Sequence, residues 1–310
     1  MKLFTPDAVK LGFIGLGNMG SRIAQRLLNH GYSLTAYDRD PAKSEAIAAH
    51  GGMVASSTAE VARAADVILS CLTNDEAVQN VYYGETGVLA NAKPGTLVLE
   101  MSTLFPNTSR ELYERGSEHQ VEVLDVAISG STPAAEQGSL ILLVGGDAKL
   151  FEDAQPLFRT ISARSFLMGS SGAGTTMKLV VNTLLGVGMQ AIAEAIPLGE
   201  KAGIERNRLL EVLSQTAVIA PAHVGKLTRA AHEDYSPQFP LRLMNKDFHL
   251  ILETAKLLNV LMPATMAALD INSMELTDNP EADFSAVIRR MEQLGHVSAS
   301  DSVPATPTAA

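Results

Sequence analysis

The sequence predicts an α/β fold in which an N-terminal doubly wound parallel sheet is followed by an all-helical C-terminal domain. In the first half of the chain, short apolar runs recur with helical stretches between them, as is typical of parallel strands buried on both faces. After Gly169 the strand-like runs stop and only helical periodicity continues. We therefore expect an α/β domain over residues 1–168, a helical domain over 169–295 and a disordered tail over 296–310.

The elements of the first domain are expected to alternate between strand and helix. The expected strands are Leu11–Ile14, Ser33–Tyr37, Val67–Cys71, Leu97–Leu99 and Val121–Val126. The expected helices are Ser21–Asn29, with its apolar side chains on one face, and Ala42–Ala49. Ile141–Val144 is followed by a Gly-Gly-Asp turn, so we expect it to be an antiparallel or edge addition to the sheet.

The second domain is expected to begin with one long buried helix, Gly172–Lys201. Its centre is apolar, but polar residues such as Asn182 and Glu194 interrupt it, which argues against a membrane span. The further expected helices are Arg206–Gln215, Leu241–Leu258, Pro263–Leu276 and Phe284–Gln293.

Composition excludes several classes of protein. Hydrophobic residues make up 46% of the chain and charged residues 19%, which is ordinary globular composition and excludes disorder as the main state. The 24 Lys and Arg against 34 Asp and Glu give a formal net charge of −10, which argues against nucleic-acid binding. The single cysteine, Cys71, excludes an intramolecular disulfide and favours a cytoplasmic location. No secretion signal is recognisable, and no spacing of His, Asp or Glu predicts a metal site.

A glycine-rich loop directly follows the first expected strand and opens the first helix. It reads Gly15-Leu16-Gly17-Asn18-Met19-Gly20. The first glycine permits a tight turn, the second lets the backbone approach a pyrophosphate, and the third lets helix and strand pack closely. The N–H groups at the start of the helix would face the phosphates. This loop predicts a dinucleotide-binding domain of the Rossmann type.

Two adjacent residues of opposite charge bear on the choice of dinucleotide. Asp38 follows the second strand at the distance expected for the carboxylate that binds the adenine ribose hydroxyls, which favours NAD. Arg39 could instead bind the 2′-phosphate of NADP, or be a solvated loop charge. We expect NAD to be preferred and NADP to be the alternative.

Several motifs in order, over roughly residues 9–292, resemble the β-hydroxyacid dehydrogenase family, which includes 3-hydroxyisobutyrate dehydrogenase and tartronate semialdehyde reductase. The motifs are the glycine loop, Asp66–Thr73, Met101–Thr103, Asp125–Gly130, Gly172–Asn182 and Lys246-Asp247. The resemblance implies that Leu72, Thr73, Thr103 and Lys246 contact the cofactor. It also implies a homodimer or homotetramer.

The resemblance further implies that Ser129 and Gly130 bind the substrate carboxylate. Here Ser131 stands where the family commonly has a second glycine. This serine adds a hydroxyl group and reduces backbone freedom, so its effect on substrate recognition stays open.

Lys178 is the expected general acid and base. In an apolar stretch, burial would lower the pKa of its ammonium group toward the working range, and the ammonium could stabilise an alkoxide. Asn182, four residues later on the same helical face, could hold the substrate hydroxyl or orient the lysine. If the two residues are considered alone, the simpler interpretation is a lysine that reaches solvent and an asparagine that packs between helices. The resemblance makes the catalytic interpretation the preferred one.

The sequence therefore predicts an NAD(P)-dependent oxidoreductase that interconverts a small β-hydroxyacid and its semialdehyde. The alternatives are an imine reductase of the same fold and a non-catalytic NAD(P)-binding sensor or scaffold. The resemblance suggests that imine reductases often replace the catalytic lysine, which is retained here.

Overall fold

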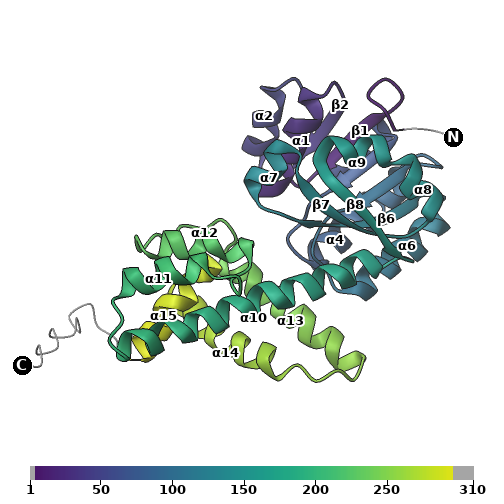
Figure 1. Cartoon of the computed structure of the whole chain (residues 1–310). Coiled ribbons are helices and arrows are strands. Elements are labelled where there is room, and N and C mark those ends of the chain that lie inside the picture. The colour runs from purple at the N-terminus through teal and green to yellow at the C-terminus, as the bar shows by residue number, and fades with distance from the viewer. Residues whose placement is uncertain (1–3, 296–310) are drawn as a thin grey trace, which may run out of the picture. The chain divides into compact units, whose positions relative to one another are not determined.

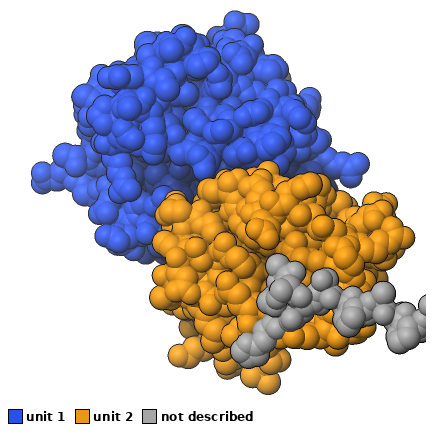
Figure 2. Space-filling view, turned by 90° about the vertical axis from the view of Figure 1, so that its left-hand side faces the viewer, with its two compact units in different colours: residues 1–179 blue, residues 180–310 orange. Residues whose placement is uncertain are grey.

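The computed structural model describes residues 4–295, so the predicted disordered tail lies outside the described residues. The chain divides into two compact units, Met1–Leu179 and Val180–Ala310 (Figure 2). The first unit is built on a mostly parallel sheet, and the described part of the second unit is helical. The predicted fold class is confirmed.

The first unit contains one eight-stranded sheet in the order β3-β2-β1-β4-β5-β6-β7-β8. Figure 1 labels β1, β2, β6, β7 and β8 of this sheet. The strands are β1 Lys10–Ile14, β2 Ser33–Tyr37, β3 Met53–Val54, β4 Val67–Ser70, β5 Leu97–Glu100, β6 Glu122–Ser129, β7 Leu140–Gly145 and β8 Ser162–Gly169. Neighbouring strands are parallel except β6 and β7. The strand order reverses between β1 and β4, where ligands of doubly wound sheets bind at the carboxyl ends of the strands.

The strands that were not predicted have mostly exposed side chains. β3 has two residues, both exposed, and β8 is an edge strand whose side chains are mostly exposed. The expected addition Ile141–Val144 lies in β7, which is antiparallel to β6. It is not an edge, because β8 pairs with its other side.

Helices cover both faces of the sheet and enclose a hydrophobic core on each. One core includes side chains from the helices α1 Asn18–Asn29, α2 Pro41–Ala48, α7 Thr132–Gln137, α8 Ala148–Asp153 and α9 Gln155–Ile161. The other includes side chains from α3 Thr58–Ala64, α4 Asp75–Tyr82, α5 Val88–Asn91 and α6 Pro106–Glu118. The sequence did not predict α6, because its buried positions are mainly proline, threonine, serine and glycine and show no apolar stripe.

The long helix α10, Ala173–Lys201, begins in the first unit and continues into the second. The predicted boundary at residue 168 therefore falls eleven residues before the one in the structure, at residue 179. The start of α10 stays with the sheet because Asp125 of β6 accepts hydrogen bonds from the N–H groups of Gly172 (2.7 Å) and Thr175 (2.8 Å).

The second unit packs the rest of α10 with shorter helices. These are α11 Arg206–Gln215, α12 Pro221–Ala230, α13 Leu241–Leu257, α14 Pro263–Asp278, the 3-10 turn η1 Phe284–Ala286 and α15 Val287–Leu294. A buried ion pair joins Lys226 of α12 to Asp283 before η1 at 2.7 Å. Among residues 4–295, α10 alone is long and apolar enough to cross a membrane, a test that core helices of soluble proteins also pass.

Candidate functional site

The glycine loop joins β1 to α1 with the geometry that its sequence predicts. Gly15 has a φ of +89°, and a Cβ at this position would collide with the carbonyl oxygen of Cys71. A Cβ at Gly20 would collide with the carbonyl of Gly15, so helix and loop can be this close only with glycine there. Around Gly17, in contrast, there is no heavy atom within 4 Å of where a Cβ would stand. The loop therefore leaves open space beside its second glycine.

The start of α1 suits an anion. Gly17 is the N-cap of this 12-residue helix and provides no side-chain hydrogen bond to the first N–H groups. The first turn of a helix has no internal partners for its N–H groups and carries partial positive charge. Asn18 is exposed and Met19 is half-buried, so the first turn is open to an approaching ligand. A dinucleotide pyrophosphate fits this loop because both the space and the donors are present.

Asp38 is fixed beside the same loop at the carboxyl end of β2. Its Oδ2 accepts a hydrogen bond from the N–H of Leu16 at 2.7 Å, and its Oδ1 accepts one from the N–H of Asp40 at 2.9 Å. The ammonium of Lys43 is 3.9 Å from Oδ1. Arg39 is exposed. The structure thus brings the predicted ribose-binding carboxylate against the predicted phosphate loop.

The loops after β4 and β5 lie at the same edge of the sheet. Leu72 and Thr73 follow β4, and Thr103 follows β5 after two residues. The N–H of Cys71 donates to the carbonyl of Ile14 at 2.9 Å, at the end of β1. The N–H of Leu72 donates to Oγ of Ser102 at 2.7 Å, which ties the two loops together. The predicted cofactor residues of the first unit therefore converge on the carboxyl ends of β1, β2, β4 and β5.

Ser129 ends β6, which is parallel to β5, so this residue and Gly130 lie at the same edge. Gly130 has a φ of +144°, a conformation that favours glycine. Ser131 has a φ of −102° and is the N-cap of α7, without a side-chain cap bond. The expected loss of backbone freedom at Ser131 therefore causes no strain, because the backbone there is extended and suits any residue.

Asp125 anchors the segment that leads to Lys178. Its side chain is buried and accepts hydrogen bonds from two N–H groups and, at 3.3 Å, from Oγ1 of Thr175. Burial raises the pKa of the Asp125 carboxyl, and these donors oppose that rise. Lys178 follows Thr175 in α10 and is half-buried.

Asn182 and Lys246 lie in the second unit, where both contact Asp247. The side-chain N–H of Asn182 donates to Oδ2 of Asp247 at 2.6 Å, and the ammonium of Lys246 is 3.1 Å from Oδ1. Asn182 is 1% exposed, and its Oδ1 has no hydrogen-bond partner among the described residues. This oxygen can accept a hydrogen bond from a donor such as a hydroxyl or an ammonium.

Two buried carboxylates, one in each unit, hold predicted site residues or their loops in place, and neither was predicted to do so. Glu100 ends β5 and bonds to the loop that carries Thr103, and Asp247 holds Asn182. Each left a weak signal in the sequence, because Glu100 closes an otherwise apolar strand and Asp247 directly follows Lys246. The signal does not name Asn182 as a partner of Asp247, since 65 residues separate the two in the chain.

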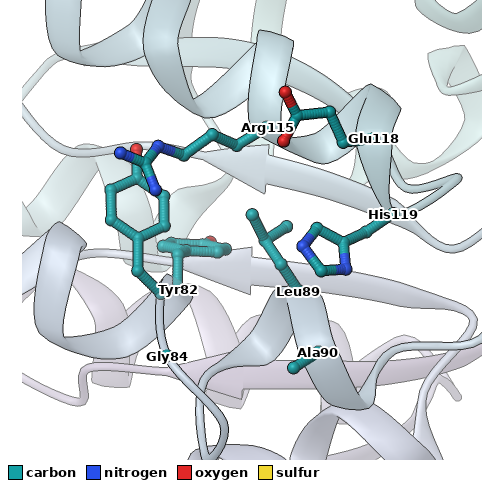
Figure 3. Close-up of a pocket in the computed structure, with 8 residues that line it drawn as sticks. Tyr82, Gly84, Leu89, Ala90, Arg115, Glu118 and His119 are labelled. Atoms are coloured by element: carbon teal, nitrogen blue, oxygen red, sulfur yellow. The ribbon is translucent and has the colours of Figure 1, made fainter.

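An open cavity of about 70 Å³ lies in the first unit beside α4, α5 and α6 (Figure 3). It is lined by Tyr82, Tyr83, Gly84, Leu89, Ala90, Arg115, Glu118 and His119. None of the predicted site residues is among them. Within residues 4–295 there is no group of three or more His, Cys, Asp or Glu side chains that could hold a metal ion.

Two family models match nearly the whole chain. Residues 10–169 match the NAD binding domain of 6-phosphogluconate dehydrogenase. Residues 172–291 match the NAD-binding domain of NADP-dependent 3-hydroxyisobutyrate dehydrogenase.

Several known proteins are similar to this chain over most of their own length. The 2-(hydroxymethyl)glutarate dehydrogenase of Eubacterium barkeri is 34% identical over 94% of this chain and 98% of its own. The NAD-dependent L-serine dehydrogenase of Pseudomonas aeruginosa is 35% identical over 90% and 96%. The structure of Mycobacterium tuberculosis 3-hydroxyisobutyrate dehydrogenase with L-serine matches with a TM-score of 0.83, 32% identity and coverage of 91% and 98%.

Proposed function

Since the chain belongs to the β-hydroxyacid dehydrogenase family, we propose that it interconverts a small β-hydroxyacid and its semialdehyde. It is an NAD(P)-dependent oxidoreductase that acts on CH–OH groups. The observation that supports this proposal best is the convergence of the glycine loop, Asp38 and the loops after β4 and β5 on one edge of the sheet.

The residues that would hold the dinucleotide follow from that convergence. The first turn of α1 would donate to the pyrophosphate beside Gly17, and Leu72, Thr73 and Thr103 would contact the nicotinamide half. When bound, the cofactor supplies the hydride acceptor or donor. Lys246 would add a positive charge toward the cofactor.

We expect NAD to be preferred over NADP. Asp38 can accept hydrogen bonds from both ribose hydroxyls, and its negative charge would repel a 2′-phosphate. Lys43 is 3.9 Å from this carboxylate, so it weakens the repulsion without replacing the hydroxyl acceptor. Replacing Asp38 with Ala should therefore raise the efficiency with NADPH relative to NADH.

We assign the transfer of the hydroxyl proton to Lys178. Its ammonium would protonate the developing alkoxide during reduction, and its free amine would accept the hydroxyl proton during oxidation. The free Oδ1 of buried Asn182 would orient that hydroxyl or the lysine, while Asp247 fixes the amide from its other end. Ser129 and the backbone at Gly130 would bind the substrate carboxylate with hydroxyl and N–H donors.

The test is a hydride-transfer assay with NADH and NADPH against semialdehydes of 3-hydroxyisobutyrate, 3-hydroxypropionate, 4-hydroxybutyrate and glycerate. We expect turnover by the unaltered protein and a fall in kcat of at least about a hundredfold for Lys178→Met, the usual size of a general acid–base contribution. Lys201→Met is the matched control, since Lys201 is the exposed last residue of the same helix. Its kcat should stay unchanged.

Other outcomes would overturn the proposal in different ways. Undiminished turnover by Lys178→Met would remove the lysine from the chemistry. Turnover of cyclic imines without turnover of semialdehydes would favour an imine reductase. Binding of NADH with no turnover across the whole panel would favour a sensor or scaffold. A clear preference for NADPH would overturn the role proposed for Asp38.

A cytoplasmic location and assembly into a homodimer or homotetramer, both expected from the sequence, stay predictions. Light scattering of the purified protein would measure the assembly.

A further inference from the structure

A buried cluster of hydrogen-bonding side chains lies directly behind the loops that we assign to the cofactor. It consists of Ser70 at the end of β4, Tyr82 at the end of α4, Glu100 at the end of β5, and Ser102. All four are at most 4% exposed. Oγ of Ser70 contacts Oε2 of Glu100 and lies 2.5 Å from the Tyr82 hydroxyl. Among residues 4–295, the acidic side chain therefore has hydroxyl and backbone groups as its hydrogen-bond partners.

The cluster is joined to the cofactor loops through Ser102. The N–H of Ser102 donates to Oε1 of Glu100 at 2.7 Å, and its Oγ accepts from the N–H of Leu72 at 2.7 Å. Thr103 is the next residue in the chain. One carboxyl group thus fixes the loop after β5 directly and the loop after β4 through one serine hydroxyl.

The hydrogen bonds of this cluster can run in two directions. With Glu100 ionised, Tyr82 donates to Ser70 and Ser70 donates to Glu100, so the protons of these two hydroxyls both have an acceptor. With Glu100 protonated on Oε2, its O–H donates to Ser70 and Ser70 donates to Tyr82, so the Tyr82 proton loses Ser70 as its acceptor. Protonation also removes the charge that strengthens the bond from the Ser102 N–H.

We propose that Glu100 is a positioning residue that, in its ionised form, holds Leu72 and Thr103 in place for the nicotinamide half of the cofactor. This inference rests on the proposed dinucleotide function. Glu100 acts through Ser102 and the loops, and is not assigned a contact with substrate or cofactor.

The surroundings of Glu100 allow both proton states near neutral pH. Burial raises the pKa of its carboxyl to about 7, although the hydrogen bonds from Ser102, Ser70 and Tyr82 oppose the rise. On the neighbouring strand the residue in register is Asp125, whose side chain faces the same side of the sheet. Tyr82, from α4, is the other titratable group of the cluster, and burial keeps its pKa well above the ordinary value, so it stays neutral. No Lys, Arg or His is hydrogen-bonded or ion-paired to Glu100 among the described residues.

The experiment is a direct titration of NADH binding, by its fluorescence, between pH 5.5 and 8.5. NADH is chosen because its pyrophosphate does not titrate in this range. In the unaltered protein, Kd should fall about fivefold as pH rises through 7, the worth of roughly one hydrogen bond. Glu100→Gln keeps the shape but resembles the protonated form, so its Kd should stay at the weak value at every pH. Cofactor KM should follow Kd, with kcat at saturation little changed.

A second variant, Tyr82→Phe, tests whether the hydrogen bonds of the cluster reverse their direction. Tyr82→Phe removes the hydroxyl whose proton loses Ser70 as its acceptor when Glu100 is protonated, and it removes a donor that supports the ionised form. The midpoint of the Kd profile should therefore move to higher pH. Glu122→Gln, an exposed carboxylate on β6, is the matched control and should keep the profile of the unaltered protein.

The outcomes separate this inference from the proposed function. If neither the unaltered protein nor any variant binds NADH or NADPH, the proposed dinucleotide function itself is wrong. If the unaltered protein binds NADH and Glu100→Gln shows the same pH profile, the role of Glu100 is wrong. A loss of affinity in Glu100→Gln that is equal at all pH values would also overturn it, because a merely structural defect would give that result.

Discussion

Glu100 and Asp125 are the same chemical group in nearly the same place, yet their partners differ. They are register partners on the adjacent strands β5 and β6, both are 2% exposed, and burial raises the pKa of both. Asp125 accepts its main hydrogen bonds from the backbone N–H groups of Gly172 and Thr175. Glu100 accepts from one backbone N–H and from the hydroxyl of Ser70.

The difference lies in what the donors can do when the carboxylate gains a proton. A backbone N–H can only donate, so Asp125 must stay an acceptor on both oxygens to keep the start of α10 attached to the sheet. A hydroxyl can donate or accept, so the partners of Glu100 can reverse. Burial by itself does not tell whether an acidic side chain acts as a fixed anchor or as a titrating group.

The largest expected effect comes from making the same isosteric change at both positions. Asp125→Asn places an amide N–H against a backbone N–H, so we expect the free energy of unfolding to fall by about 3 kcal/mol. Glu100→Gln should leave it unchanged or raise it at pH 8, because the hydroxyls rearrange. Urea unfolding of both variants measures the difference.

Glu122→Gln on β6 is the control for this pair, since its side chain is exposed. Equal losses for Asp125→Asn and Glu100→Gln would contradict the distinction between the two carboxylates. Asp125→Asn should also lower kcat, because the segment that leads to Lys178 loses its anchor.

A smaller effect is expected from pH. The pKa of Glu100 is raised from its ordinary value of 4.5 to about 7, so the folded protein binds this proton more tightly than the unfolded chain does. The stability that Glu100 contributes is fully present below the pKa it has in the unfolded chain, and it is lost as pH rises through the pKa it has in the folded protein. Between pH 5.5 and 7, at about 1.4 kcal/mol per pH unit, the loss is about 2 kcal/mol.

Unfolding of the unaltered protein and of Glu100→Gln at several pH values isolates this contribution as a difference. The two proteins should be about equally stable near pH 5, and Glu100→Gln should be the more stable at pH 8. A difference that does not vary with pH would show that Glu100 does not titrate in this range.

The smallest expected effect concerns Thr175. Its hydroxyl is 2.8 Å from Oγ of Ser109 and 3.3 Å from Oδ2 of Asp125, whereas its N–H makes the shorter bond to the carboxylate. Thr175→Val keeps the N–H and removes the hydroxyl, so it should cost about 1 kcal/mol of unfolding free energy. Thermal unfolding measures this loss of stability. A loss as large as that of Asp125→Asn would show that the hydroxyl of Thr175, and not its backbone N–H, anchors the helix to Asp125.

The sequence predicted the parts of the molecule whose residues are adjacent in the chain. Gly15 to Gly20 need only a strand before them and a helix after them, and their geometry is as predicted. The anchoring bonds were not predictable, because 47 residues separate Asp125 from Gly172 and 65 separate Asn182 from Asp247. The edge strand β8 was missed for a different reason, since its exposed side chains give no buried-strand pattern.

The open space beside Gly17 has a consequence for mutational scans of this chain. Alanine at Gly15 or Gly20 would collide with backbone, so either change should be lost in any selection for folded protein. Alanine at Gly17 meets no protein atom, so it should survive that selection and fail only where the dinucleotide must bind. A residue that tolerates substitution in a selection for folding but not in a selection for dinucleotide binding marks a surface whose shape is set by the ligand.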